Sequence, residues 1–112
     1  MPRKKKAPED EAPDDVIIDP KDVQLVFSEE VVTLWLSKSH ARLVNAVDSV
    51  LLEEEALPQG HMVALLVWAL AALRPGGVIL VPEVFLGNEY LEPLAYLGPS
   101  RSFFAFRKEI QL

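Results

Sequence analysis

The pattern of apolar and polar positions divides the chain into a charged start and a body of short apolar runs. After Met1, residues 1–15 contain no apolar side chain larger than alanine, apart from their prolines. Such a segment buries too little surface to offset the entropy lost on ordering. We therefore predict a disordered charged arm over residues 1–15 and a single folded domain over residues 16–112.

Two β-rich runs open the domain, VQLVF at residues 23–27 and VVTLWL at residues 31–36, with SEE between them. This arrangement predicts an antiparallel hairpin, with one long bent strand as the alternative. Trp35 would then lie on the less apolar face, where it either anchors a partner or packs under the charged arm. Alternation in the second run separates a core face from an opposite face: Val32, Leu34 and Leu36 against Thr33, Trp35 and Ser37.

The next segment has apolar residues at helical spacing and predicts an amphipathic helix of about four turns. Ser37 or Ser39 is a suitable N-cap for it. Three consecutive carboxylates, Glu53 to Glu55, are expected to end this helix or to lie just beyond it, because negative charge opposes the helix dipole there. The apolar positions are Leu43, Val44, Val47, Val50 and Leu51.

A second helix is predicted from Met62 to Leu73, after the connection Pro58-Gln59-Gly60. It has no polar face, so it must be covered on most of its sides. A chain of 112 residues has difficulty covering such a helix alone, which predicts a homo-oligomeric interface with Trp68 as the largest anchor. At about 18 Å, this helix is too short to cross a membrane.

The remaining residues predict a turn, a buried strand, a short helix and a final strand. Pro75, Gly76 and Gly77 form the turn that leads into the strand at residues 78–81, and Asn88 caps a short helix ended by Gly98 and Pro99. The final strand, residues 102–110, has Phe103, Ala105 and Arg107 on one face and Phe104, Phe106 and Lys108 on the other.

Together these elements predict a small α+β domain with the order β-β-α-α-β-α-β. An antiparallel or mixed sheet would pack on two or three helices. The two edge-strand candidates for pairing with another chain are Val16 to Ile18 and Ser102 to Ile110.

Charge and composition narrow the classes of function. The formal net charge of -6 argues against broad binding of a phosphate backbone. The basic run Arg3, Lys4, Lys5 and Lys6 is either a local phosphate contact or a solubilising tail. The chain has no cysteine, which excludes disulfides, thiolate metal sites and thiol nucleophiles. A cytoplasmic location is the default expectation.

Catalytic chemistry has few candidates in this sequence. The only histidines are His40 and His61, both near predicted helix starts, where surface or capping roles are common. No phosphate-binding loop, zinc-protease, EF-hand or nucleophile-elbow pattern occurs. We therefore predict a protein that is not an enzyme and that has no cofactor and no metal.

The run LRPGGVILV at residues 73–81 resembles the joint between a helix and a central strand in class I S-adenosylmethionine methyltransferases. VQLVFSEEV from residue 23 is similar to the strand after the nucleotide site, and FFAFRK to the family's closing strand. The glycine-rich loop and the acidic residue that grips the ribose are both missing. The resemblance therefore implies a degenerate fragment without a cofactor site.

A weaker resemblance links residues 31–73 to ribbon-helix-helix repressors and antitoxins, in which paired strands enter the major groove. It implies that Thr33, Trp35 and Ser37 face the groove, although none of these is an Arg, Lys, Asn or Gln that reads base edges.

The preferred interpretation is a non-enzymatic interaction or assembly module, such as a small adaptor, inhibitor or virion protein. It would act through the apolar helix and its edge strands on a protein partner or on itself, away from membranes. The candidate contact residues are Trp35, Trp68, Phe104 and Phe106.

Overall fold

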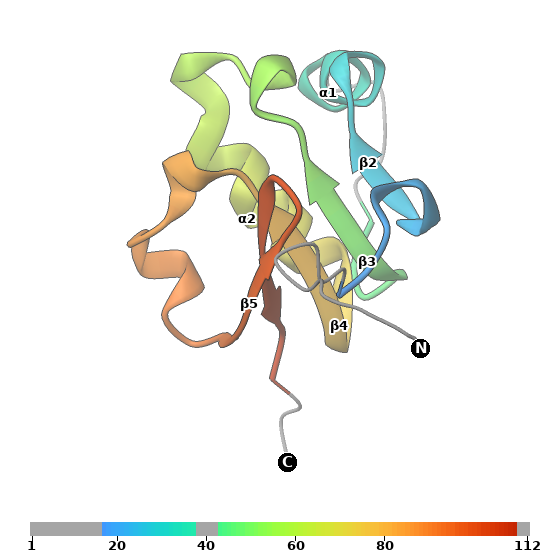
Figure 1. The fold of residues 1–112 in the computed structure, drawn as a ribbon. Helices are drawn as coiled ribbons and strands as arrows, with labels where there is room; N and C mark the ends of the chain where they lie inside the picture. The colour runs from blue at the N-terminus through green and yellow to red at the C-terminus, as the bar shows by residue number, and fades with distance from the viewer. Residues whose placement is uncertain (1–16, 38–42, 110–112) are drawn as a thin grey trace, which may run out of the picture.

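A five-stranded mixed sheet forms the centre of the molecule, which the computed structural model describes over residues 17–37 and 43–109 (Figure 1). The strand order is β2-β3-β4-β6-β5; β2, β3 and β4 run parallel, and β6 runs antiparallel to both of its neighbours. The predicted α+β class is confirmed. The strands are β2 (Leu25–Phe27), β3 (Val47–Leu52), β4 (Leu73–Val81), β5 (Ala95–Ser100) and β6 (Phe103–Arg107).

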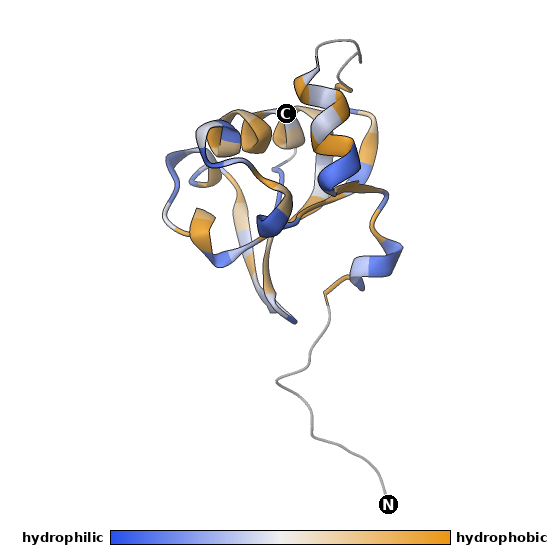
Figure 2. Cartoon of the chain, turned by 90° about the horizontal axis from the view of Figure 1, so that it is seen from above, coloured by the Kyte–Doolittle hydropathy of each residue, from blue (hydrophilic) through white to orange (hydrophobic). Residues whose placement is uncertain are grey.

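Two helices connect the parallel strands: α1 (Glu29–Leu36) joins β2 to β3, and α2 (Met62–Ala72) joins β3 to β4. Figure 2 shows α2 as hydrophobic over most of its length, whereas α1 begins with a hydrophilic turn. Within the described residues, no helix is long and apolar enough to cross a membrane. The shorter 3-10 turns are η3 (Pro20–Asp22), η4 (Glu54–Ala56), η5 (Gln59–His61), η6 (Glu83–Phe85) and η7 (Glu89–Leu91).

Some predicted features fall outside the described residues and stay predictions. They are the arm over residues 1–15 with its basic residues Arg3, Lys4, Lys5 and Lys6, the cap Ser39, the histidine His40, and the two strand ends Val16 and Ile110.

The predicted hairpin over residues 23–36 is wrong in its second half, because residues 29–36 form α1. Ser28 occupies the N-cap position, and Glu29 and Glu30 fill the first turn, where carboxylates interact favourably with the helix dipole. Val32 and Trp35, three residues apart, are the buried side chains of this helix. The exposed residues include Leu34, which the strand prediction had placed on the core face. Packing thus overrides the β-propensity of the run.

The predicted helix over residues 43–51 is also wrong, because residues 47–52 form strand β3. Four consecutive residues, Ser49 to Leu52, are buried, as expected for a parallel strand covered on both faces. Glu53 to Glu55 therefore follow a strand rather than ending a helix, and Ser37 is the C-cap of α1 rather than an N-cap. The ribbon-helix-helix resemblance implies the order strand, helix, helix. The elements observed in the same part of the chain are α1, β3 and α2, that is, helix, strand, helix.

The joint after α2 is a bulge within a strand rather than a turn before one. Between the partner pairs Val47–Leu73 and Ser49–Val78, the single residue Asp48 stands opposite residues 74–77. Gly76 has a positive φ of 88°, which favours glycine. A Cβ on Gly77 would lie 2.8 Å from the Asp48 carbonyl oxygen. Position 76 therefore favours glycine because of its backbone conformation, and position 77 requires glycine because the backbone of β3 lies so close.

In the last part of the chain, the predicted short helix and final strand both form, but their extent and the pairing of the strand differ from the prediction. Asn88 caps a short helix as predicted, and its side chain accepts a hydrogen bond of 2.8 Å from the Tyr90 N–H, but this helix is the single turn η7. Gly98 and Pro99 lie in β5 instead of ending a helix. Strand β6 lies between β4 and β5, so the prediction that residues 102–110 form an edge strand is wrong.

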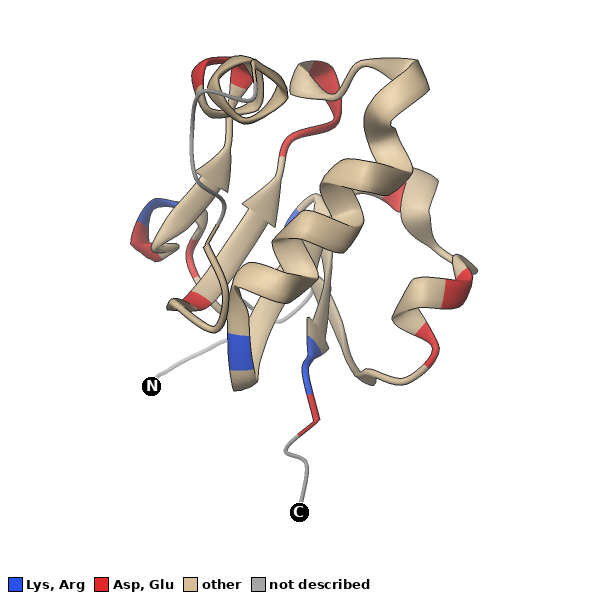
Figure 3. Cartoon of the chain, turned by 180° about the vertical axis from the view of Figure 1, so that it is seen from behind, with Lys and Arg blue, Asp and Glu red and all other residues tan. Residues whose placement is uncertain are grey.

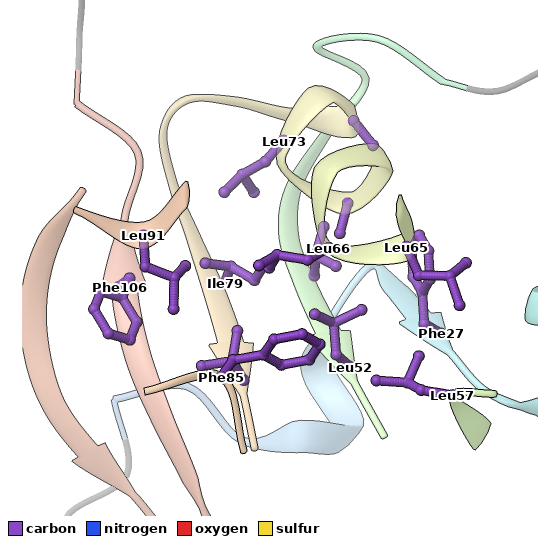
Figure 4. Packing of buried hydrophobic residues seen from close by; sticks show 14 of the residues in the cluster. Phe27, Leu52, Leu57, Leu65, Leu66, Leu73, Ile79, Phe85, Leu91 and Phe106 are labelled. Atoms are coloured by element: carbon purple, nitrogen blue, oxygen red, sulfur yellow. The ribbon is translucent and has the colours of Figure 1, made fainter. Parts of the chain in front are cut away.

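The sheet separates a large core from a small one. On the first face, side chains from α2, η6 and η7 meet those of the sheet, as Figure 4 shows for Leu66, Phe85 and Leu91. Phe104 and Phe106 belong to this face, whereas Phe103 and Ala105 belong to the second, as predicted. The second core has the buried residues Leu51, Leu80 and Ala105, with Ile18, Val23, Val26, Val78, Leu97 and Phe103 packed around them.

Candidate interaction surface

Helix α2 presents an inner face to the sheet and an outer face of apolar side chains away from it. The outer face consists of Val63, Val67 and Ala71, which lie at helical spacing, with Leu70 at its edge, where it packs partly against the first core. Val63 is 48% exposed and Val67 is 37% exposed. Leu70 and Ala71 are half-buried. The inner residues Leu65, Leu66, Ala69 and Ala72 are fully buried.

The carboxyl end of α2 is held by Lys108 at the end of β6. Its ammonium group donates hydrogen bonds of 2.8 Å to the carbonyl oxygens of Leu70 and Leu73. These oxygens belong to the last turn of the helix and the residue after it, where a cation also interacts favourably with the helix dipole. Burial lowers the pKa of the Lys108 ammonium. This contact orients α2 on the sheet and so determines which side faces outward.

The four aromatic residues predicted to contact a partner lie against or within the first core. Trp35 is 2% exposed, and its ring lies 4.9 Å from Phe27 and 6.3 Å from Trp68, centroid to centroid. Phe106 is also buried and packs against Tyr96 with the two rings tilted by 49°, while Trp68 and Phe104 are half-buried. A contact role for these residues stays a prediction. The structure does not gather them into one exposed patch.

Helix α1 differs from α2 in the surroundings of its exposed apolar residue. Leu34 is 51% exposed and shares an open groove with Val31, Glu29, Glu30 and Thr33. Two carboxylates and a hydroxyl group therefore border the apolar residues of this groove, as is ordinary for a solvated helix face. Residues 62–72 of α2 include no charged side chain at all.

A second hollow lies at the carboxyl ends of β2 and β3. It is an open cavity of about 330 Å³ lined by Glu29, Glu53, Glu55 and Ala56. Nevertheless, among the described residues no group of three histidines or carboxylates is arranged to hold a metal ion. Of the two histidines considered as catalytic candidates, His61 lies within the described residues. It is exposed at the start of α2 and does not line this cavity.

Sequence reasoning identified α2 but did not identify its outer face. Because every side of the helix is apolar, no polar stripe in the sequence marks Val63 and Val67 as exposed. Side-chain size does not mark the face either, because the inner face holds both leucines and alanines and Ala71 lies on the outer face. The exposed side is identified only by the sheet that covers the other side.

Comparison with protein-family models, with curated proteins and with solved structures finds no match to this chain. The segments quoted for the methyltransferase resemblance form a strand at β2, a helix at α2 and strands at β4 and β6, the element types that the resemblance implies. Kinship with that family stays a prediction.

Proposed function

We propose that this chain is a non-enzymatic protein-interaction module whose contact surface is the outer face of α2. The observation that carries the proposal is the exposure of Val63 and Val67 on a helix without charged residues. A helix that is apolar on all sides is normally covered on all sides. A protein partner would complete the cover that the sheet provides on one side.

The energetic argument rests on the apolar area that a partner would remove from water. Fully burying a valine stabilises by roughly 1.5–3 kcal/mol, and the two outer valines are already partly buried. Covering both therefore contributes a few kcal/mol before the costs of association. The remaining free energy of binding must come from contacts around the valines, where half-buried Leu70 and Ala71 lie.

A thiol-labelling experiment tests the proposal, because the chain has no cysteine and any introduced thiol is unique. The Val67→Cys variant places that thiol on the outer face of α2. The Val84→Cys variant is the matched control, since Val84 is 52% exposed on η6. Each variant is produced in cells that naturally carry the chain and is treated with a maleimide reagent in native extract.

We expect the thiol at position 67 to react more than about tenfold slower than the thiol at position 84, because a partner shields it. In urea the two rates should become equal. Equal rates in native extract would contradict the proposal, since an uncovered outer face reacts like any other exposed position.

A further inference from the structure

The charges around α2 are distributed unevenly between its two ends. Five carboxylates lie toward the end where α2 begins, in α1 and in the segment before η5, and Figure 3 shows them together at one end of the molecule. They are Glu29, Glu30, Glu53, Glu54 and Glu55.

The opposite end carries charges of both signs. Arg74 lies two residues after the end of α2 and pairs with Asp48 at 3.1 Å. Arg107, Lys108 and Glu109 end the described chain nearby, because β6 pairs with β4 and Lys108 contacts the last turn of α2. The outer face therefore runs from a strongly acidic end to a weakly basic one.

We propose that the outer face of α2 packs against the outer face of α2 in a second copy of this chain, with the two helices antiparallel. This inference rests on the proposed function and names the partner. A two-fold pair uses the same surface on both copies, so every apolar residue of the face is used twice.

Charge complementarity decides the direction of packing. In an antiparallel pair the acidic end of each copy lies beside the end of its partner that carries Arg74 and Arg107, because these charges lie at opposite ends of α2. A parallel pair would instead place five carboxylates beside five others, and this juxtaposition of like charges disfavours it. The net charge of -6 on each copy opposes self-association in every orientation, and the antiparallel arrangement limits this repulsion because it keeps the two acidic ends apart.

The geometry of the helix assigns the contacts. Val67 is the central residue of Met62–Ala72, so it meets its counterpart on the two-fold axis. Val63 meets Ala71 of the other copy, because each lies four residues from the centre. The two copies of Val63 are then separated by about 12 Å along the axis, at 1.5 Å per residue. Ala71 is small enough to let the two helices approach closely.

Light scattering on the purified full chain tests association. Because a small interface associates weakly, the measurement uses a high concentration, about 100 μM, at which we expect a mass twice the monomer's 12.5 kDa. Val67→Glu should reduce the mass to the monomer's, whereas the control Val84→Glu should leave it doubled. Circular dichroism confirms that each variant is folded, and Val63→Glu provides a second variant if Val67→Glu unfolds.

Disulfide trapping under mild oxidation tests the direction of packing. A disulfide requires Cα atoms within about 7 Å. We expect Val67→Cys to cross-link with itself, Val63→Cys to remain uncross-linked, and a mixture of Val63→Cys with Ala71→Cys to cross-link. Parallel helices would instead let Val63→Cys cross-link with itself, which overturns the antiparallel arrangement.

A purified chain that stays monomeric at 100 μM also overturns this inference. Shielding of position 67 in native extract would then still support an interaction with a different protein, so failure of the inference is distinguishable from failure of the proposed function.

Discussion

The two faces of the sheet are covered by different kinds of structure. The first face lies under α1, α2, η6 and η7, and its core includes the largest buried side chains, among them Trp35 and Leu66. The second face lies under a chain segment, residues 18–23, that covers Leu51, Leu80 and Ala105. We infer that the first face supplies most of the stability of the domain.

The covering segment of the second face is attached by a few polar contacts. The Ile17 N–H donates to the Ser100 hydroxyl oxygen at 3.0 Å, and the Gln24 N–H donates to the Ser49 hydroxyl oxygen at 2.8 Å. Arg101 and Asp19 form an ion pair at 3.9 Å with the arginine side chain half exposed, and such pairs contribute little. A segment held in this way can adjust to changes beneath it, unlike a helix packed on a sheet.

The largest effect is expected for Leu66→Ala on the first face. Leu66 is fully buried between α2 and the sheet, and the rigid surroundings leave a cavity, so the free energy of unfolding should fall by about 4 kcal/mol. Urea unfolding followed by circular dichroism measures it. The control Val63→Ala, on the exposed side of the same helix, should change it by less than about 0.5 kcal/mol when measured at a protein concentration low enough to keep the chain monomeric. Similar losses in the two variants would invalidate the assignment of inner and outer faces.

A smaller loss is expected for Gly77→Ala at the joint between α2 and β4. The added Cβ would lie 2.7 Å from Leu73 Cδ1 and 2.8 Å from a backbone oxygen of β3, and such overpacking costs about 3 kcal/mol. Thermal unfolding measures the loss. Gly60→Ala is the control, because nothing lies within 4 Å of the Cβ it adds. If Gly77→Ala were as stable as Gly60→Ala, the close approach would not constrain the joint.

Leu80→Ala tests the second face with the same chemical change as Leu66→Ala. Both leucines are fully buried, but the segment above Leu80 can settle into the vacated space, so we expect a loss of about 2 kcal/mol. Urea unfolding of the two variants side by side gives the difference. A loss equal to that of Leu66→Ala would mean that the two faces are equally rigid.

The smallest effect is expected for Lys108→Met, which removes two hydrogen bonds from the end of α2 and keeps an apolar stem. We expect a loss of about 1 kcal/mol at neutral pH. Because burial lowers the pKa of Lys108, the unfolded chain binds more protons than the folded chain just below the usual lysine pKa. The contribution of this group to stability therefore rises with pH in that window.

Urea unfolding across alkaline pH measures this rise, which should be absent from Lys108→Met. The control Lys21→Met changes an exposed lysine on η3 and should keep it. A rise of the same slope in both variants would assign it to another group.

The local pattern of apolar residues was sufficient to predict the type of some elements and was ambiguous for others. The end of helix α2 was predicted to within one residue, because a long apolar run indicates a buried helix and the proline after it cannot continue one. The run VVTLWL fits both an alternating strand and a helix that buries Val32 and Trp35, and packing of these two residues in the first core favours the helix. The apolar residues from Leu43 to Leu51 likewise have helical spacing, while pairing with β2 and β4 on both sides makes their second half a strand.

The sequence by itself determined that a short, uniformly apolar helix must form and be covered. It could not determine which side of that helix stays exposed, because a helix without a polar stripe has no preferred direction of burial. Tertiary contacts decided this: the sheet buries Leu65, Leu66 and Ala69, Lys108 holds the end of α2, and Val63 and Val67 remain outside. Direction of burial depends on what lies opposite each residue, and that depends on parts of the chain distant in sequence.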